Sequence, residues 1–204
     1  MKTFNNYISE KLVINKNTKL HYRFFPTSKI QLIDIIKQRM KEEGNECDLN
    51  DIDVSEITDM TYLFFNNTLR NFTGNISQWD VSNVKSMEKM FAYSEFNGDI
   101  SDWNVGNVKD MNAMFCHSLF TGDISKWDVS KVENMNAMFM WSKFNNDISK
   151  WNISNVEDMG EMFAHSHFNQ DISNWNVNKV ESMIHIFAYS PLEDKQKEWW
   201  NRKY

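Results

Sequence analysis

A unit of 24 residues, repeated five times in constant register, is the strongest constraint on how this chain can fold. Each copy approximates F-N-x-D-I-S-x-W-(D/N)-V-S-N-V-x-x-M-x-x-M-F-x-x-S, and its tryptophan recurs at Trp79, Trp103, Trp127, Trp151 and Trp175. A repeat of this length cannot bury its apolar face alone, so it stacks on its neighbours. The sequence therefore predicts stacked coils, an architecture that mostly presents surfaces.

The copy from Phe96 to Phe115 shows how one coil is expected to run. Ile100 stands among polar residues over 97–101, which predicts a short strand with Ile100 facing inward. From Val108 onward the apolar residues follow at spacings of three, three and one, as in a short amphipathic helix. The prediction is an α/β solenoid: a leucine-rich-repeat-like, right-handed coil of strand, corner and short helix, with a parallel sheet on one side and helices on the other.

The spacing also predicts which side chains form the core. They are the residues equivalent, in every copy, to the following: Ile100, Trp103, Val105, Val108, Met111, Met114, Phe115 and Phe120. The helical spacing of the methionines favours a core role over a methionine-rich binding surface. Cys116 stands in a column of small residues and Cys47 lies outside the repeats, so neither is expected in a disulfide.

Three regions are expected along the chain. Residues 1–50 form an N-terminal cap with one helix over about 29–43, capped by Ser28 and ended by Gly44. Residues 51–190 form the solenoid, one degenerate coil with Ile52 in the tryptophan position followed by five regular coils. Residues 191–204 form a C-terminal capping helix, in which Trp199 and Trp200 cover the last layer of the core.

One column outside the core contains only aromatic rings, although the columns beside it vary. Its members are Tyr93, His117, Trp141, His165 and Tyr189. Partly exposed rings offer large contact areas at little entropic cost, so this column is a candidate binding surface for a protein or a glycan. The alternative is that the rings stack between coils and only stabilise the fold.

A second column repeats an aspartate and a serine on the expected strand face: Asp99, Ser101, Asp123, Ser125, Asp147, Ser149, Asp171 and Ser173. Stacked carboxylates repel by about 1 kcal/mol per pair in water, so hydrogen bonds or a cation must offset them. Structural hydrogen bonding is the favoured interpretation and calcium the alternative. A third column is expected only to cap turns: Asp80, Asn104, Asp128, Asn152 and Asn176.

Composition and motifs argue against several classes of function. The net charge is −6 with scattered basic residues, which argues against nucleic acid as the ligand. Nucleotide-binding and hydrolase motifs are absent, and the histidines lack the spacing of metal ligands. A catalytic acid needs its own environment to shift its pKa, whereas the aspartates here repeat in equivalent environments. We therefore expect no enzyme activity, no cofactor and no metal. The chain has no apolar signal segment and no run of 18 apolar residues, so we expect no membrane insertion and a cytoplasmic location as encoded.

The string from Asp99 to Phe115, D-I-S-D-W-N-V-G-N-V-K-D-M-N-A-M-F, resembles the BspA-like leucine-rich-repeat surface proteins, whose repeat is also seen in mycoplasma lipoproteins. The resemblance covers roughly 51–190, and the segment from Gly44 to Ser55 resembles the N-terminal cap of short members from gut bacteria and their phages. It implies a leucine-rich-repeat fold and, for secreted members, adhesion, but no catalytic residues. Secreted members carry a signal peptide, a lipid-attachment cysteine or a wall anchor, which this chain is expected to lack. For such a member, the resemblance implies a virion or intracellular role.

Two hypotheses about function follow from the sequence. The first is a non-enzymatic module that binds a protein or glycan through its strand face or its ring column. The second is a structural, self-associating scaffold, such as a virion-associated protein, whose end coils or sheet edges pair with copies of itself. Display on a virion or a cell surface by a non-classical route stays open.

Overall fold

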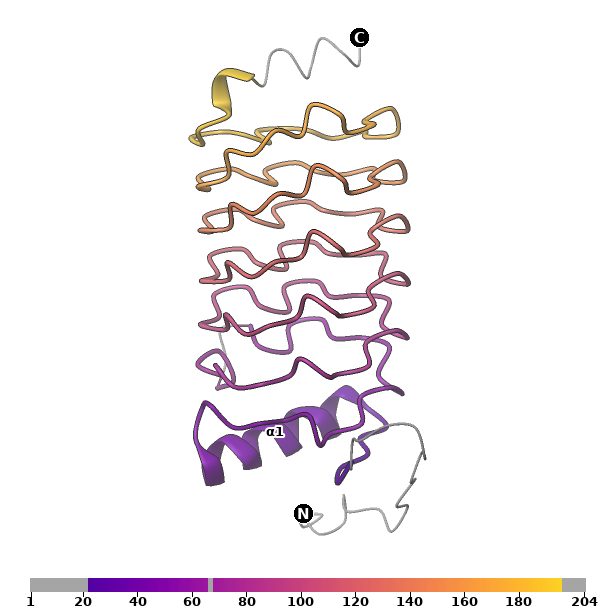
Figure 1. The fold of residues 1–204 in the computed structure, drawn as a ribbon, viewed down its shortest axis with the longest axis vertical. Coiled ribbons are helices and arrows are strands. Elements are labelled where there is room, and N and C mark those ends of the chain that lie inside the picture. The colour runs from indigo at the N-terminus through magenta and orange to yellow at the C-terminus, as the bar shows by residue number, and fades with distance from the viewer. Residues whose placement is uncertain (1–21, 66–67, 196–204) are drawn as a thin grey trace.

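The computed structural model describes residues 22–65 and 68–195. Within them the chain runs in successive flat loops, one per repeat, that lie on top of one another along the long axis (Figure 1). The helix α1, Lys29–Glu43, lies across the N-terminal end of this stack, and the short 3-10 helix η2, Glu193–Lys195, lies at the other end (Figure 1). These two helices are the only ones in the described residues.

The expected α/β architecture is wrong. In the described part of the chain neither the strand predicted over 97–101 nor the helix predicted after Val108 is formed, in this copy or its equivalents, and no sheet exists. The description as a leucine-rich-repeat-like solenoid of strands and helices therefore fails. Neighbouring loops are joined instead by isolated parallel bridges, of which one series runs through Asp59, Ser86, Asp110, Asn134, Asp158 and Ser182.

The helix fails to form because the backbone amides alternate between two kinds of partner. Met111 and Ala113 donate N–H to carbonyl oxygens of the next coil, at 2.9 and 2.8 Å, and Phe115 and His117 continue the series. The amides between them close tight turns within the coil, for example from Met114 to the carbonyl of Met111 at 3.2 Å. In an α-helix, each of these amides would donate to the carbonyl four residues earlier in the same coil, and every φ would be negative. Ala113 instead has φ 49° and His117 φ 54°. We call residues 109–117 and their equivalents the ladder segment.

The strand fails to form because side chains and turns satisfy its backbone. Asp99 accepts a hydrogen bond from the amide of Ser101 at 2.9 Å, and Trp103 N–H closes a turn onto Ile100 at 3.2 Å. The indole N–H of Trp127, in the following coil, also donates to the Ile100 carbonyl at 3.1 Å. The same indole bond recurs in every coil, so the tryptophan takes the place of a backbone donor.

The predicted core is confirmed. Every tryptophan, methionine and phenylalanine of the core columns is buried, and the phenylalanines stack from coil to coil, as Phe115 and Phe139 do at 5.8 Å between ring centroids. Each fully buried large side chain contributes about 1.5–3 kcal/mol before conformational entropy is counted. Burial of this stack, together with the bridges and hydrogen bonds between coils, therefore holds the loops together without a sheet.

The N-terminal end is closed by α1, whose range is the one that the sequence analysis gives. The Ser28 side chain accepts from the amide of Gln31, and Gly44 ends the helix at φ 88°, in the left-handed region that favours glycine. Lys29 ties α1 to the first loop, with its Nζ 2.6 Å from Asp59 Oδ2 and 3.1 Å from the Thr61 carbonyl.

At the C-terminal end, most of the expected capping helix, with Trp199 and Trp200, lies outside the described residues, and the division into three regions stays a prediction. In residues 22–65 and 68–195, no helix has both the length and the apolar character needed to cross a lipid bilayer.

Candidate functional site

The five rings of the ring column, which we define as Tyr93, His117, Trp141, His165 and Tyr189, form one continuous stack. Successive ring centroids are 4.4, 5.4, 3.9 and 4.5 Å apart, and successive planes differ by 12°, 12°, 6° and 16°. Phe65 extends the row at the N-terminal end, with its ring edge-on to Tyr93 at 5.9 Å. The structure thus brings all five predicted residues together.

Stacking determines which part of each ring can reach a partner. The faces of the inner rings are covered by the rings above and below, so only their edges point to solvent. Tyr93 and Trp141 nevertheless remain 45% and 49% exposed, and Tyr189, the last ring, is 73% exposed. Ring edges carry the positive part of the aromatic quadrupole. The column is therefore a narrow apolar ridge of edges.

The backbone does not require rings at these positions. All five residues have a left-handed backbone, with φ between 54° and 59°, which costs an L-residue about 1–2 kcal/mol. A second left-handed column, four residues earlier in each coil, has the same strain but mixed side chains: Lys89, Ala113, Ala137, Glu161 and His185. The same positive φ in the second column occurs with alanine and with charged residues, so the backbone conformation does not explain the rings. The rings therefore serve stacking or recognition.

Exposed apolar side chains gather at this ridge. Among residues 22–65 and 68–195, seven large hydrophobic residues are exposed, and three of them belong to the ring column. Leu119, which is 47% exposed, follows His117 by two residues, and Tyr62 contacts Phe65 edge-on at 5.3 Å. The other two, Ile30 and Ile184, lie in α1 and in the last coil. A concentration of exposed apolar surface of this kind marks interaction sites.

Two ionisable groups at the ridge are held neutral by their surroundings. Burial, and next the nearby His165, lower the pKa of His117 from its ordinary value of 6.5. Burial raises the pKa of the Cys116 thiol to about 11. An imidazole that resists protonation and a thiol that resists ionisation favour apolar contact over chemistry.

The aspartates and serines of the second column form a hydrogen bond within each coil. The carboxylates of Asp99, Asp123, Asp147 and Asp171 accept from the amides of Ser101, Ser125, Ser149 and Ser173 at 2.8–2.9 Å. Bonds from the serine amide, and then from its hydroxyl, lower the pKa of Asp99, Asp123 and Asp147. This geometry agrees with the structural interpretation, in which each aspartate stabilises its own turn.

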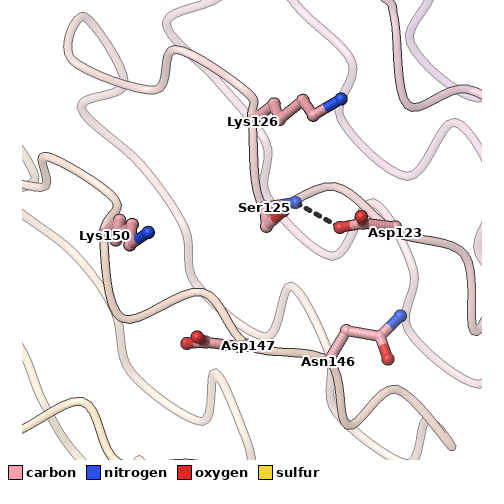
Figure 2. A pocket seen from close by; sticks show the side chains of 6 residues that line it. All are labelled: Asp123, Ser125, Lys126, Asn146, Asp147 and Lys150. Carbon is pink, nitrogen blue, oxygen red and sulfur yellow. Dashed lines mark hydrogen bonds between the residues drawn. The ribbon is translucent and has the colours of Figure 1, made fainter.

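A shallow open depression of about 510 Å³ lies over two coils of this aspartate column (Figure 2). Asp123, Ser125 and Asp147 line it with Lys126, Lys150 and Asn146. The two lysines were not predicted as site residues, because their column varies between copies. Asn75 stands in this column one coil before Asp99, and Asp48, which was not predicted, stands one coil before Asn75. Asn75 Nδ2 lies 3.4 Å from Asp48 Oδ2. The first coil is 27 residues long, as the spacing from Ile52 to Trp79 shows. Counting 27 residues back from Asn75 therefore gives Asp48.

The third column caps turns, as predicted. The side-chain oxygens of Asp80, Asn104, Asp128, Asn152 and Asn176 accept from the amide two residues later at 3.0–3.2 Å. Within the described ranges, no three His, Cys, Asp or Glu side chains lie close enough together to hold a metal ion. The polar residues therefore act in turns and contacts between coils.

Comparison with known protein families identifies the family of this chain. Residues 33–140 and 116–203 match the family described as "Mycoplasma protein of unknown function, DUF285". The matched ranges span most of the sequence, and the chain belongs to this family. This confirms the expected relation to mycoplasma repeat proteins at the level of the family. Comparisons with curated proteins and with solved structures found no match.

Proposed function

We propose that this chain is a non-enzymatic binding module whose ring column contacts a protein partner. The observation that carries the proposal is the continuous ring stack, which keeps Trp141 49% exposed at its centre although a buried core lies directly beneath. Partly exposed aromatic side chains are the residues that contribute most to protein interfaces. The ionisable groups support the absence of catalysis, because the aspartates are engaged in turns and Cys116 has a pKa of about 11.

The geometry favours a protein over a glycan. Sugars bind aromatic residues by lying flat on an open ring face, and the inner rings of the column have both faces covered. Edges in a row suit insertion between the side chains of a partner protein. Nucleic acid is an unsuitable partner, because the chain carries a net charge of −6.

A closer relation to BspA-like surface proteins is also part of the proposal. It rests on the string from Asp99 to Phe115, and it would make contact with proteins outside the chain the natural role of the ridge. The cytoplasmic location expected as encoded, and display on a virion or cell surface by a non-classical route, stay predictions.

The proposal is tested with the purified chain and the triple variant H117A/W141A/H165A. The wild-type chain, the triple variant and a control variant are each immobilised and exposed to a mycoplasma protein extract. In a separate experiment they are exposed to a panel of glycans. The control, Ile30→Ser, removes an exposed apolar residue of α1, outside the ring column. We expect the chain and the control to retain a protein that the triple variant loses, while all three keep the same circular dichroism. Equal retention by the triple variant, or binding of glycans alone, would contradict the proposal.

A further inference from the structure

We propose that a second copy of this chain is a partner of the ring column, related to the first by a twofold axis along the ladder segment of the central coil, residues 133–141. The inference rests on the proposed function, since it names the protein that the ridge contacts. Two columns at opposite ends of the ladder segment point to the same axis independently.

The ring column is a palindrome. Its order from the N-terminal to the C-terminal end is Tyr, His, Trp, His, Tyr, with Trp141 in the middle. When two copies meet face to face with their stacks antiparallel, Trp141 meets its own copy and His117 meets His165 of the second copy. A twofold interface requires this self-complementarity, because the same patch is used on both sides.

The charged column at the start of the ladder segment is complementary about the same coil. It reads, in order, Lys85, Lys109, Glu133, Glu157 and Glu181, and all five side chains are exposed. The axis that reverses the ring column opposes Lys85 to Glu181 and Lys109 to Glu157 of the second copy. Opposite charges in this arrangement set the register of an interface and exclude wrong pairings.

Two like-charge contacts created by this axis are offset within each copy. Glu133 meets its own copy, but Lys109 Nζ lies 2.7 Å from its carboxylate. Asp110 meets Asp158 of the second copy, but each carboxylate is half-buried and accepts the amide two residues later, at 2.9 and 2.8 Å. Two copies of the charged column bring together four lysines and six glutamates, so each Lys109 lies between Glu133 of its own copy and Glu157 of the second copy.

The surface between the two columns allows close approach. Ala92, Ala113, Cys116 and Ala137 form a shallow apolar cluster there, separate from the main core, with Met140 packed against it. These four side chains are small and buried, so they do not project between the ridge and the charged column, and both can touch a second copy at once. Each copy carries a net charge of −6, which opposes association at long range. The contact must therefore depend on the apolar ridge and on Trp141 at its centre.

Sedimentation velocity of the full chain across a wide concentration range tests the inference. We expect a monomer–dimer equilibrium, weakened at least about tenfold by Trp141→Ala and unchanged by Ile30→Ser. Two charge-reversal variants, K85E/K109E and E157K/E181K, should each dimerise at least about tenfold more weakly alone. Their mixture should form a heterodimer, because the axis then opposes glutamate to lysine in the four pairs on either side of Glu133.

A chain that stays monomeric up to about 1 mM would overturn the inference, since specific contacts are rarely weaker than this. A dimer indifferent to Trp141→Ala would place the interface elsewhere, and a mixture that gains nothing over its components would exclude this axis. The capture experiment separates the two proposals. A monomer that still retains another protein through Trp141 refutes only the second copy, whereas a monomer that retains nothing refutes both.

Discussion

The indole of Trp141 lies flat on the imidazole of His165, with their ring centroids 3.9 Å apart and their planes 6° from parallel. It is the closest pair in the ring column, and His117 covers the opposite face of the same indole at 5.4 Å. A side chain with both faces in contact and half its surface exposed can contribute to stability and recognition at once. Substitutions can separate these two roles.

Trp141→Ala should lower the free energy of unfolding by about 1–3 kcal/mol, because it removes two ring pairs worth about 0.5–1.5 kcal/mol each. Trp141→Phe keeps a stacked ring and should lose less than half as much. Urea unfolding of the two variants beside the wild type measures the difference. If Trp141→Ala unfolds at the same urea concentration as the wild type, the stack contributes nothing to stability and only recognition would explain its rings.

Acidification should destabilise the chain through His117. Burial and the nearby His165 hold the pKa of His117 below its ordinary value of 6.5, so the unfolded chain binds this proton more readily than the folded chain. The stabilisation is therefore complete above pH 6.5 and is lost as the pH falls from 6.5 through the lower, folded pKa. Urea midpoints between pH 7.5 and 5 measure it, and His117→Gln should flatten this part of the profile. A midpoint that rises on acidification in the wild type alone would reverse the sign and refute the assignment.

The core and α1 could be predicted from the sequence because apolar spacing reports burial directly. Phe115 and Met114 are buried whichever backbone carries them, so their columns were correct while the secondary structure was wrong. Spacings of three, three and one after Val108 fit an amphipathic helix, but a series of tight turns produces them too. The distinguishing feature is the left-handed backbone at Ala113 and His117, where the sequence places neither glycine nor asparagine.

The candidate sites divide in the same way. Asp99 and Ser101 form a turn that local sequence chemistry foretells, since an aspartate readily accepts the amide two residues later. The bond from the Trp127 indole to the Ile100 carbonyl joins residues 27 positions apart, and no local pattern reports it. The sheet was expected from the alternation of Ile100 with polar neighbours, a pattern that a series of side-chain-capped turns produces as well.

Asp123 should act as a turn acceptor rather than as a metal ligand. Asp123→Asn keeps the side-chain oxygen that accepts from Ser125 and should change stability little, whereas Asp123→Ala should cost about 1 kcal/mol. Thermal melts of both variants, with calcium and with a chelator, provide the measurement. The melting temperature of the wild type should be the same in both solutions. A large rise with calcium that Asp123→Asn abolishes would restore the cation interpretation.

Trp127→Phe tests the indole hydrogen bond apart from the bulk of the side chain. The substitution leaves an aromatic ring in the core but removes the indole donor to the Ile100 carbonyl. Because the Trp103 N–H still donates to this carbonyl, the loss should cost about 0.5–1.5 kcal/mol. Trp127→Ala removes both ring and donor and should cost about 3–5 kcal/mol. Chemical denaturation of the two variants gives the comparison. If Trp127→Phe were as stable as the wild type, the indole hydrogen bond would contribute nothing to stability beyond the bond from the Trp103 N–H.

His185→Gly should stabilise the chain, in contrast to most substitutions in a repeat. His185 is exposed in the last coil and has φ 54°, a conformation that costs an L-residue about 1–2 kcal/mol and glycine almost nothing. After the greater flexibility of glycine in the unfolded chain is subtracted, a gain of about 0.5–1 kcal/mol is expected. The control is Ile184→Gly next to it, which is 61% exposed and lacks a positive φ. Ile184→Gly should lower the free energy of unfolding by about 0.5–1 kcal/mol. Urea titrations of the two variants should therefore give changes in this free energy of opposite sign, which would establish the left-handed backbone at His185. Changes of the same sign would argue against it.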